Sequence, residues 1–178
     1  MASIAIAHPD KALFTELFRT AFTIAEDEHE GALVADLTAG LVPLVDQDRV
    51  WCFGHYHDDA LVGAIFFSRL EYPSLAGVYL LAPVAVRTDF QRQGVGQTLI
   101  RYGLTVLAEQ GAQVALTYGD PAYYGRFGFQ PLSETLLQAP LTLSMPFGWQ
   151  GQSLQGGTIP QCTERPQCVE PFANPALW

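Results

Sequence analysis

The densest group of residues suited to chemistry is the segment Gln91–Gln97, in which Gly94 and Gly96 stand two apart. A strand-like apolar pattern precedes it and a helical pattern follows it, so we expect a strand-to-helix turn. Backbone N–H groups at a helix start have no helical acceptor, and the helix dipole favours an anion there. Because glycine has no side chain, a phosphate can approach the backbone. The segment therefore predicts an anion site.

Two common nucleotide motifs do not fit this turn. The Rossmann fingerprint requires a third glycine, and Gln97-Thr98-Leu99 supplies none. A Walker loop requires Gly-Lys-Ser or Gly-Lys-Thr, and neither occurs in the chain. The expected phosphate ligand is therefore bound in another way.

Cysteine and histidine form no metal-binding pattern. The three cysteines are irregularly spaced, which predicts free thiols rather than a zinc site or a disulfide framework. His55 and His57 lie two apart on one face of an expected strand, with no third ligand nearby. We interpret both as surface residues and expect no metal.

Alternating strands and helices must position the turn. Strands are expected at residues 3–7, 50–57, 61–69, 77–87 and 113–118, and helices after Pro9, from about residue 33 to 41, and at 95–110. Asp58-Asp59-Ala60 predicts a hairpin turn. Pro83 cannot donate a ladder hydrogen bond, so it predicts an edge, a bulge or a break in pairing.

The segment after the last of these strands predicts a short helix. Asp120-Pro121 is typical of an N-cap followed by proline at the first helical position. This helix would carry Tyr123 and Tyr124 and end near Gly128. Strand, helix and strand in this order predict a parallel pair with a crossover helix.

The bulk numbers favour one domain, covering residues 1–178. Its proline- and glycine-rich segment at about 140–178 is expected to be irregular and to pack on the rest. A net charge of -9 without a Lys/Arg run argues against nucleic acid as a partner. No apolar stretch is long enough to span a membrane and no signal peptide is visible, which favours a cytoplasmic protein.

Two motifs resemble those of one family. Gln91-Arg92-Gln93-Gly94-Val95-Gly96 is similar to the Gln/Arg-x-x-Gly-x-Gly/Ala signature of GNAT (GCN5-related) acetyltransferases, and Leu81–Val86 resembles the strand that precedes it. The segment Gly119–Phe129 resembles the closing tyrosine-helix-Gly-Phe segment, in the form typical of the YhbS-like branch. The match is clear from about Val50 to Pro131.

The resemblance implies an α/β fold. A central, twisted, mostly antiparallel sheet would have helices on both faces and one splayed parallel strand pair, here 77–87 and 113–118. Unpaired backbone groups in the splay would bind the pantetheine arm of acetyl-CoA. The implied cofactor-binding residues are Val84, Ala85, Val86, Gln91, Arg92, Gln93, Gly94, Val95, Gly96, Gln97, Asp120 and Tyr124, with charge added by Arg87 and Arg92.

The resemblance also implies catalytic roles. A backbone N–H of Val84 or Val86 would polarise the thioester carbonyl. The family tyrosine precedes the Gly of Gly-Phe by four residues, which selects Tyr124 as the acid for the thiolate, with Tyr123 as the alternative. The general base stays open among Glu26, Glu28, His29, Glu30 and Glu71, and the family pattern favours Glu30.

The expected function is acetyl transfer from acetyl-CoA to an amine on a small molecule or peptide. Two alternatives stay open: a non-catalytic acyl-CoA-binding regulatory module, and a transferase of the same fold that uses a longer acyl group. The resemblance is compatible with a homodimer. The sequence does not identify the acceptor.

Overall fold

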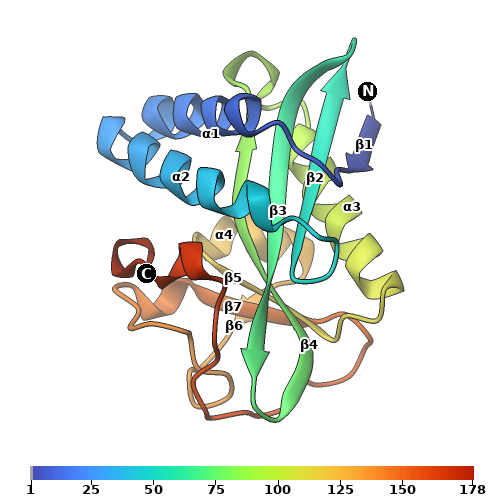
Figure 1. The fold of residues 1–178 in the computed structure, drawn as a ribbon. Helices are drawn as coiled ribbons and strands as arrows, with labels where there is room; N and C mark the ends of the chain where they lie inside the picture. The colour runs from blue at the N-terminus through green and yellow to red at the C-terminus, as the bar shows by residue number, and fades with distance from the viewer. Residues whose placement is uncertain (1) are drawn as a thin grey trace. The chain divides into compact units, whose positions relative to one another are not determined.

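The computed structural model of the chain describes residues 2–178. Its helices are α1 (Lys11–Ala25), α2 (Glu28–Leu41), α3 (Val95–Glu109) and α4 (Pro121–Tyr124). Its strands are β1 (Ala2–Ala5), β2 (Val50–His57), β3 (Ala60–Tyr72), β4 (Leu75–Val86), β5 (Val114–Tyr118), β6 (Gln130–Pro131) and β7 (Trp149–Ser153), as Figure 1 shows. Short 3-10 turns connect several of them.

Within the described residues, the seven strands form one mixed sheet in the order β1-β2-β3-β4-β5-β7-β6. The pair β4–β5 is parallel, while β1–β2, β5–β7 and β6–β7 are antiparallel. Because α3 connects the two parallel strands, it is the crossover helix that the sequence predicted. The expected α/β fold, with a mostly antiparallel sheet and one parallel pair, is confirmed.

Close contacts divide the chain into two compact units. The first unit comprises the described residues up to Phe67 and Pro83–Gly103. The second unit comprises Ser68–Ala82 and Leu104–Trp178. Strands β3 and β4 and helix α3 each contribute residues to both units. The expectation of a single domain stays a prediction.

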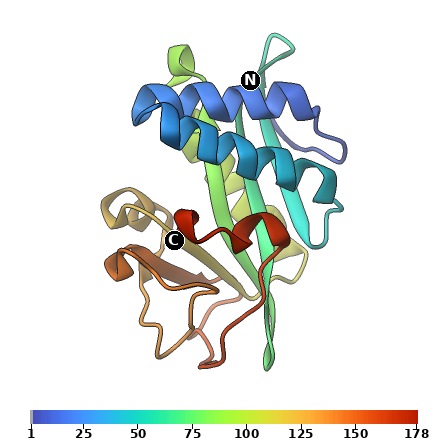
Figure 2. The same cartoon turned by 60° about the vertical axis from the view of Figure 1, so that its left-hand side comes forward.

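Aromatic side chains form the core of the first unit on both faces of β3. Phe66 packs against Phe14 and Phe18 of α1, with ring centroids 6.2 and 5.7 Å away. Its neighbour Phe67 turns to the opposite face, where the ring of Phe53 contacts both Phe67 and Tyr102 of α3. Figures 1 and 2 show α1 and α2 side by side. Helices therefore cover both faces of this part of the sheet, as expected.

The second unit holds the irregular segment that the sequence predicted. Figure 2 shows its C-terminal part in red, with 3-10 turns at Glu170–Ala173 and Pro175–Leu177. Trp178 is buried, and its indole N–H donates to the carbonyl oxygen of Phe172 at 2.9 Å. Its ring contacts that of Trp149, itself buried in β7, in a T-shaped arrangement with centroids 6.2 Å apart. The segment therefore packs on the unit through its aromatic residues.

Local chemistry explains where the elements begin and turn. Asp10 and Asp27 cap α1 and α2 by accepting from the backbone N–H groups of Leu13 and Glu30. Asp58 and Asp59 both have positive φ values, 47° and 62°, as the tight turn between β2 and β3 requires.

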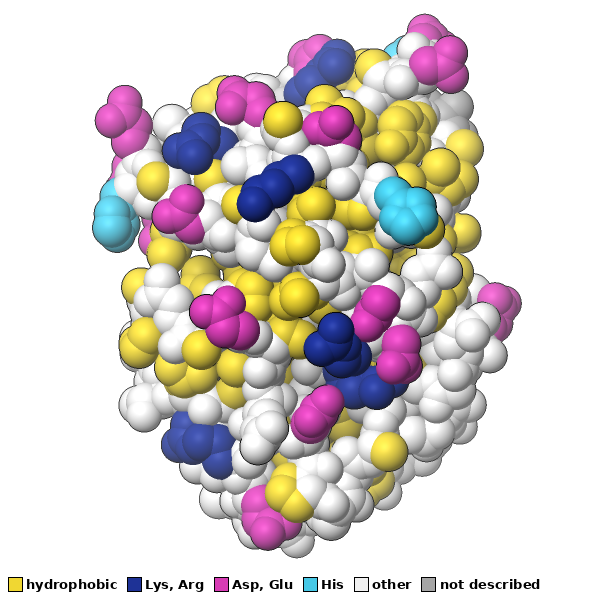
Figure 3. All heavy atoms as spheres, viewed as in Figure 1, with side chains coloured by type: hydrophobic (Ala, Val, Ile, Leu, Met, Phe, Trp, Pro, Cys, Tyr) yellow, Lys and Arg dark blue, Asp and Glu magenta, His cyan; other side chains and the backbone are white. Residues whose placement is uncertain are grey.

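The surface carries few cations. On the face shown in Figure 3, Lys and Arg side chains are interspersed with Asp and Glu rather than gathered in a patch. Among residues 2–178, no helix combines the length and hydropathy needed to cross a membrane.

Candidate active site

The parallel ladder between β4 and β5 ends abruptly. The register runs from Val78↔Val114 to Leu81↔Thr117, and β5 itself ends at Tyr118. Strand β4 continues to Val86 through Pro83, which has no N–H to donate. The edge of β4 that faces β5 therefore loses its strand partner after Leu81, at the pairing defect predicted from Pro83.

The hydrogen bonds of β4 show that its residues reverse the edge they face after this point. The carbonyl oxygen of Gly77 accepts from the backbone N–H of Gln113, the residue before β5, at 2.8 Å. The carbonyl oxygen of Leu81 accepts from Thr117 Oγ1 of β5 at 3.1 Å. Arg87 N instead donates to Val62 O of β3, at 2.8 Å. Residues an even number apart in a regular strand face the same edge, so this reversal requires an irregularity between Leu81 and Arg87.

Such an irregularity has the effect of a β-bulge, because it reverses the edge that the following residues face. Since Arg87 faces β3, strand alternation turns the preceding residue, Val86, toward the other edge. Val86 O also accepts from the side chain of Gln91, at 3.1 Å. The resemblance implied that the N–H group of Val84 or Val86 polarises the thioester carbonyl. Both residues are half-buried.

The turn between β4 and α3 is shaped for a ligand that approaches backbone. Arg92 and Gly94 adopt positive φ values of 60° and 83°. A Cβ atom added to Gly94 would meet no atom within 4 Å, so the space beside it is open. Helix α3 begins at Val95, and the first N–H groups of a helix have no helical acceptor. The segment Gln91–Gln97 can therefore hold an anion on backbone N–H groups.

Side chains of the turn brace it internally. Gln91 Nε2 donates to Val86 O, and Gln93 Nε2 donates to Asp89 O at 2.9 Å. Thr98 closes the first helical turn by donating both N–H and O–H to Gly94 O, at 2.9 and 3.0 Å. The two glutamines therefore contribute to the site by fixing the backbone, whatever else they contact.

Arg87 is engaged by its own neighbours. Its guanidinium forms two 2.7 Å bonds to the carboxylate of Asp89 and lies 4.6 Å from the centre of the Phe90 ring. Hydrogen bonding within this pair raises the pKa of Arg87 and lowers the pKa of Asp89. Arg87 was predicted to add positive charge to the cofactor site, but Asp89 neutralises that charge. Arg92 in the turn is exposed.

Tyr124 is held at the end of β5 by helix α4. Asp120 caps α4, and its Oδ1 accepts from Ala122 N at 2.9 Å, so the carboxylate predicted to touch the cofactor holds the helix start. The Tyr124 ring lies against Gly119, where a Cβ atom would come within 2.8 Å of it. Burial raises the pKa of the Tyr124 phenol, and its interaction with the Thr117 side chain opposes that rise. Sequence and packing together fix this phenol in one place.

The acidity of Tyr124 limits what it can do. Burial of the hydroxyl is the main cause that raises the pKa of Tyr124 to about 12, and the neighbouring Tyr123 adds to it. The phenol therefore keeps its proton at neutral pH. Complete transfer to a thiolate whose conjugate acid has a pKa of ~8.5 would cost ~5 kcal/mol. Tyr124 is thus suited to donate a hydrogen bond to a thiolate, and full transfer requires stabilisation of the phenolate.

Tyr123, the alternative acid, sits in a different environment. Its ring meets Tyr124 and Phe127 edge to face, with centroids 5.1 and 5.4 Å away. Burial raises the pKa of Tyr123, and the charge of Arg126 opposes that effect.

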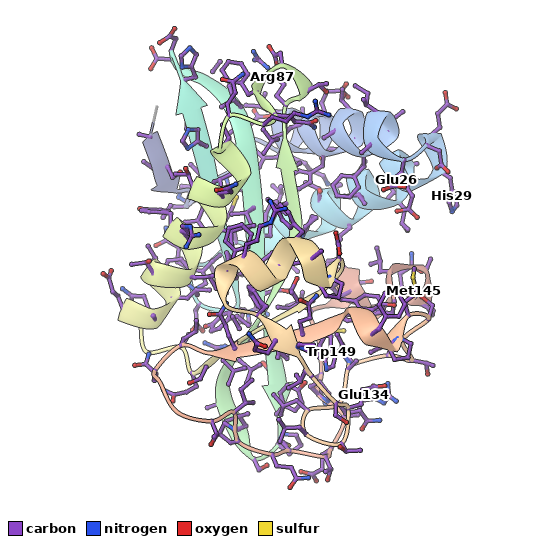
Figure 4. The ribbon with its side chains drawn as sticks, turned by 180° about the vertical axis from the view of Figure 1, so that it is seen from behind. Glu26, His29, Arg87, Glu134, Met145 and Trp149 are labelled. Atoms are coloured by element: carbon purple, nitrogen blue, oxygen red, sulfur yellow. The ribbon has the colours of Figure 1, made fainter. Side chains whose placement is uncertain are left out.

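The candidate bases lie in two places. Glu26 to His29 are exposed at the junction of α1 and α2, and Figure 4 shows Glu26 and His29 projecting outward there. Glu30 is half-buried in the first turn of α2. Glu71 belongs to the second unit, and its backbone pairs with Gln167 at 2.8 and 3.0 Å. No contact singles out one of these residues as the base, so Glu30 stays a prediction.

The sequence reading missed two polar residues that the fold buries, Thr117 and Gln150. They face each other across β5 and β7, and neither is exposed. Gln150 Nε2 donates to Gly119 O and Gly148 O, at 3.1 and 3.2 Å, and so ties the end of β5 to the start of β7. A polar residue at the end of an apolar strand was the only signal for Thr117.

The interpretation of His55 as a surface residue is wrong. His55 is only 4% exposed, and its Nδ1 lies 2.7 Å from Ser3 Oγ across the β1–β2 pair. Burial, helped by the charge of His57, lowers the pKa of His55. The edge strand β1 covers it, which the sequence pattern did not indicate. Within residues 2–178, no three His, Cys, Asp or Glu side chains group as metal ligands.

Comparison with known proteins adds an independent finding. A family model described as the acetyltransferase (GNAT) family matches residues 11–129. The uncharacterized N-acetyltransferase YjhQ of Escherichia coli K12 is 36% identical over 100 residues, which cover 54% of this chain and 55% of that protein. YhbS of the same strain is 33% identical over 112 residues, covering 59% and 60%. The matches thus span little more than half the length of these curated relatives.

Solved structures match over more of the chain. The crystal structure of E. coli YhbS in complex with CoA superposes with a TM-score of 0.79 at 24% identity, covering 97% of this chain and 92% of that one. A GNAT family acetyltransferase from Brucella melitensis in complex with acetyl-CoA gives 0.68 at 25% identity, covering 96% and 98%. These likenesses support the same fold.

Proposed function

Because this chain belongs to the acetyltransferase (GNAT) family, a family of acyltransferase enzymes, we propose that it transfers an acetyl group from acetyl-CoA to an amine. The observation that carries the proposal is the end of the β4–β5 ladder at Leu81↔Thr117, followed by a bulged, unpaired edge of β4. An extended pantetheine arm has amide groups that pair with such an edge as a further strand would.

The turn supports the binding of the cofactor's phosphates. Gly94 leaves open space beside the backbone, and the first N–H groups of α3 favour an anion. Among the charged side chains of this segment, Arg87 is neutralised by Asp89, while Arg92 is exposed. Backbone N–H groups are therefore proposed to bind the pyrophosphate, with Arg92 adding positive charge.

The reaction is proposed to be a direct attack of a neutral amine on the thioester carbonyl. The nitrogen–carbon bond forms, the carbon–sulfur bond breaks, and the electron pair leaves on sulfur. The N–H of Val84 or Val86 would polarise the carbonyl from the unpaired edge. Tyr124 would donate a hydrogen bond to the leaving thiolate, and the proton that the amine loses balances the one that the thiol gains. Glu30 is the proposed base.

A panel of amines tests the proposal. Thiol release from acetyl-CoA is measured with an aminoglycoside, a polyamine, free amino acids and a peptide with a free N-terminus, and mass spectrometry identifies the acetylated product. Amine-dependent release is the expected result. Tight binding of acetyl-CoA without release in any arm would favour a regulatory binding module. Faster release from longer acyl-CoAs would favour the longer-acyl alternative.

A further inference from the structure

Gly119, between β5 and α4, lacks a side chain at a point where the fold leaves no room for one. A Cβ atom there would come within 2.8, 3.4 and 3.8 Å of three carbon atoms of the Tyr124 ring. The φ of Gly119 lies outside the left-handed region, so the backbone itself would accept a residue with a side chain. Glycine is therefore required at this position for space and not for conformation.

The backbone of Gly119 is held on both sides by the start of β7. Its N–H donates to Gly148 O at 3.0 Å, and its carbonyl oxygen accepts from Gln150 Nε2 at 3.1 Å. Gln150 Nε2 also donates to Gly148 O, so both partners of this nitrogen are carbonyl oxygens, which can only accept. Gln150 is fully buried, where a lost hydrogen bond is costly. The Gly119 peptide therefore resists moving away from the ring.

The ring of Tyr124 would be the part that yields if residue 119 had a side chain. Carbon atoms make contact at ~3.5 Å, so the ring edge would have to retreat by about 0.7 Å. Tyr123 and Phe129 limit rotation of the ring about its own axis, because their rings contact it in T-shaped arrangements with centroids 5.1 and 5.9 Å away. The whole ring must then tilt, and a tilt displaces the hydroxyl at its far end.

We propose that Gly119 is a positioning residue for Tyr124: its bare backbone, held by Gln150, is the surface that sets where the phenol hydroxyl lies. This inference rests on the proposed function, because it takes Tyr124 as the group that faces the leaving thiolate. A hydrogen bond depends steeply on distance and angle, so a tilt of the ring would weaken the bond to sulfur. All three residues belong to the second unit.

The acceptor amine is not needed for the test, because CoA itself forms the thiolate. The dissociation constants of CoA and acetyl-CoA are measured at about pH 7 and about pH 9.5, on either side of the ordinary thiol pKa of ~8.5. Acetyl-CoA has no free thiol, so it reports the titration of all other groups. The pH effect on CoA divided by that on acetyl-CoA gives the thiolate preference. Because a donor at sulfur favours the charged form, the wild type should prefer the thiolate.

Two alanine variants separate positioning from overcrowding. Gly119→Ala should reduce the thiolate preference at least ~3-fold, and Tyr124→Phe should reduce it about 10-fold, the effect of one hydrogen bond to a charged group. Gly151→Ala is the matched control, because a Cβ atom there would also come within 2.8 Å of a side-chain atom, in this case Leu116 Cδ2. Both alanine variants should lower the urea midpoint. Gly151→Ala should leave the preference unchanged.

A double variant and a second single variant test the route of the effect. In the Tyr124→Phe background, Gly119→Ala should cause no further loss of preference, since no hydroxyl remains to be displaced. Gln150→Met removes the bond that holds the Gly119 carbonyl without adding an atom at residue 119. It should reduce the preference at least ~2-fold, and it provides the test if alanine at residue 119 prevents folding.

Each outcome supports or overturns one statement. A wild-type preference in Gly119→Ala, or an equal loss in Gly151→Ala, would overturn the positioning role. A further loss from Gly119→Ala in the Tyr124→Phe background would do the same, because the effect would not pass through the hydroxyl. An unchanged preference in Gln150→Met would overturn the role of Gln150. A wild-type preference in Tyr124→Phe would remove Tyr124 from the thiolate and the inference with it. Failure of the wild type to bind CoA or acetyl-CoA would instead reject the proposed function.

Discussion

The ring of Trp178 stacks on the ring of Tyr118, with centroids 6.0 Å apart and planes 20° apart. Tyr118 ends β5, and its hydroxyl accepts from Met145 N at 2.8 Å and lies 3.1 Å from Ser144 Oγ. The C-terminal segment therefore supports the strand end that leads into α4, and through Tyr118 it also fixes the loop before β7. Figure 4 labels Met145 in that loop and Trp149, the first residue of β7.

Trp178→Ala should lower the free energy of unfolding by about 3–5 kcal/mol, because a buried tryptophan leaves a large cavity. Deletion of all residues after Ser153 should cost more, since Phe172 is lost as well. Urea unfolding followed by circular dichroism measures both. Phe147→Ala is the control: Phe147 is 68% exposed, so its loss should stay within ~0.5 kcal/mol. Equal urea midpoints for the two alanine variants would show that the segment is dispensable.

Gly94→Glu should abolish the rise in melting temperature that acetyl-CoA gives the wild type. The glutamate would bring a side chain and a negative charge to the proposed phosphate position. Gly94→Asn controls for backbone strain, because asparagine tolerates the positive φ of 83° better than glutamate and adds no charge. It should keep part of the shift. Gly96→Glu extends the test along the turn. Identical shifts in the glutamate variants and the wild type would exclude this turn from the cofactor site.

Tyr124→Phe should lower kcat about 10²-fold, which lies within the range of both a charged hydrogen bond and general acid catalysis. The KM for acetyl-CoA should change little, because the hydroxyl acts only as charge develops on sulfur. Steady-state thiol release with an amine accepted by the wild type measures both constants. If Tyr123→Phe lowers kcat instead, the acid is Tyr123 and not Tyr124. Wild-type rates in both variants would mean that solvent or the substrate protonates the thiolate.

The protein should lose stability as the pH rises above ~10. In the unfolded chain a tyrosine titrates near ~10, whereas folded Tyr124 titrates at about 12, so the unfolded state releases its proton first. Between about pH 8 and about pH 11, Tyr124 alone should account for a loss of ~1.4 kcal/mol. Burial also raises the pKa of Tyr72, whose hydroxyl donates to Gln138 O, in the same direction.

Urea midpoints at the two pH values check this expectation. Tyr124→Phe should lose less stability over the interval than the wild type, because phenylalanine has no proton to release. A Tyr124→Phe variant with the wild-type pH slope would contradict the burial of this hydroxyl.

Local sequence patterns were enough to predict most of the helices and strands and their order. Residues 50–57 read as a strand and are β2, the helix expected at 95–110 is α3 at 95–109, and Asp120-Pro121 starts a helix as its residue types require. Pro83 correctly predicted a break in strand pairing, which follows Leu81 in the β4–β5 ladder. These features depend on local chemistry: side-chain period, capping and the missing N–H of proline. They follow from a few neighbouring residues, so a single sequence reveals them.

Which polar groups come into contact depends instead on how distant parts of the chain pack together. The hydroxyl of Thr117 finds its acceptor only because β4 places the carbonyl of Leu81 beside it. His55 is buried only because β1 pairs with β2 over it. Gln150 binds Gly119 and Gly148 because β7 folds back beside β5. Such contacts join residues far apart in the chain. Their burial and pKa values depend on that pairing, because desolvation is a property of the packed neighbourhood and not of the residue type.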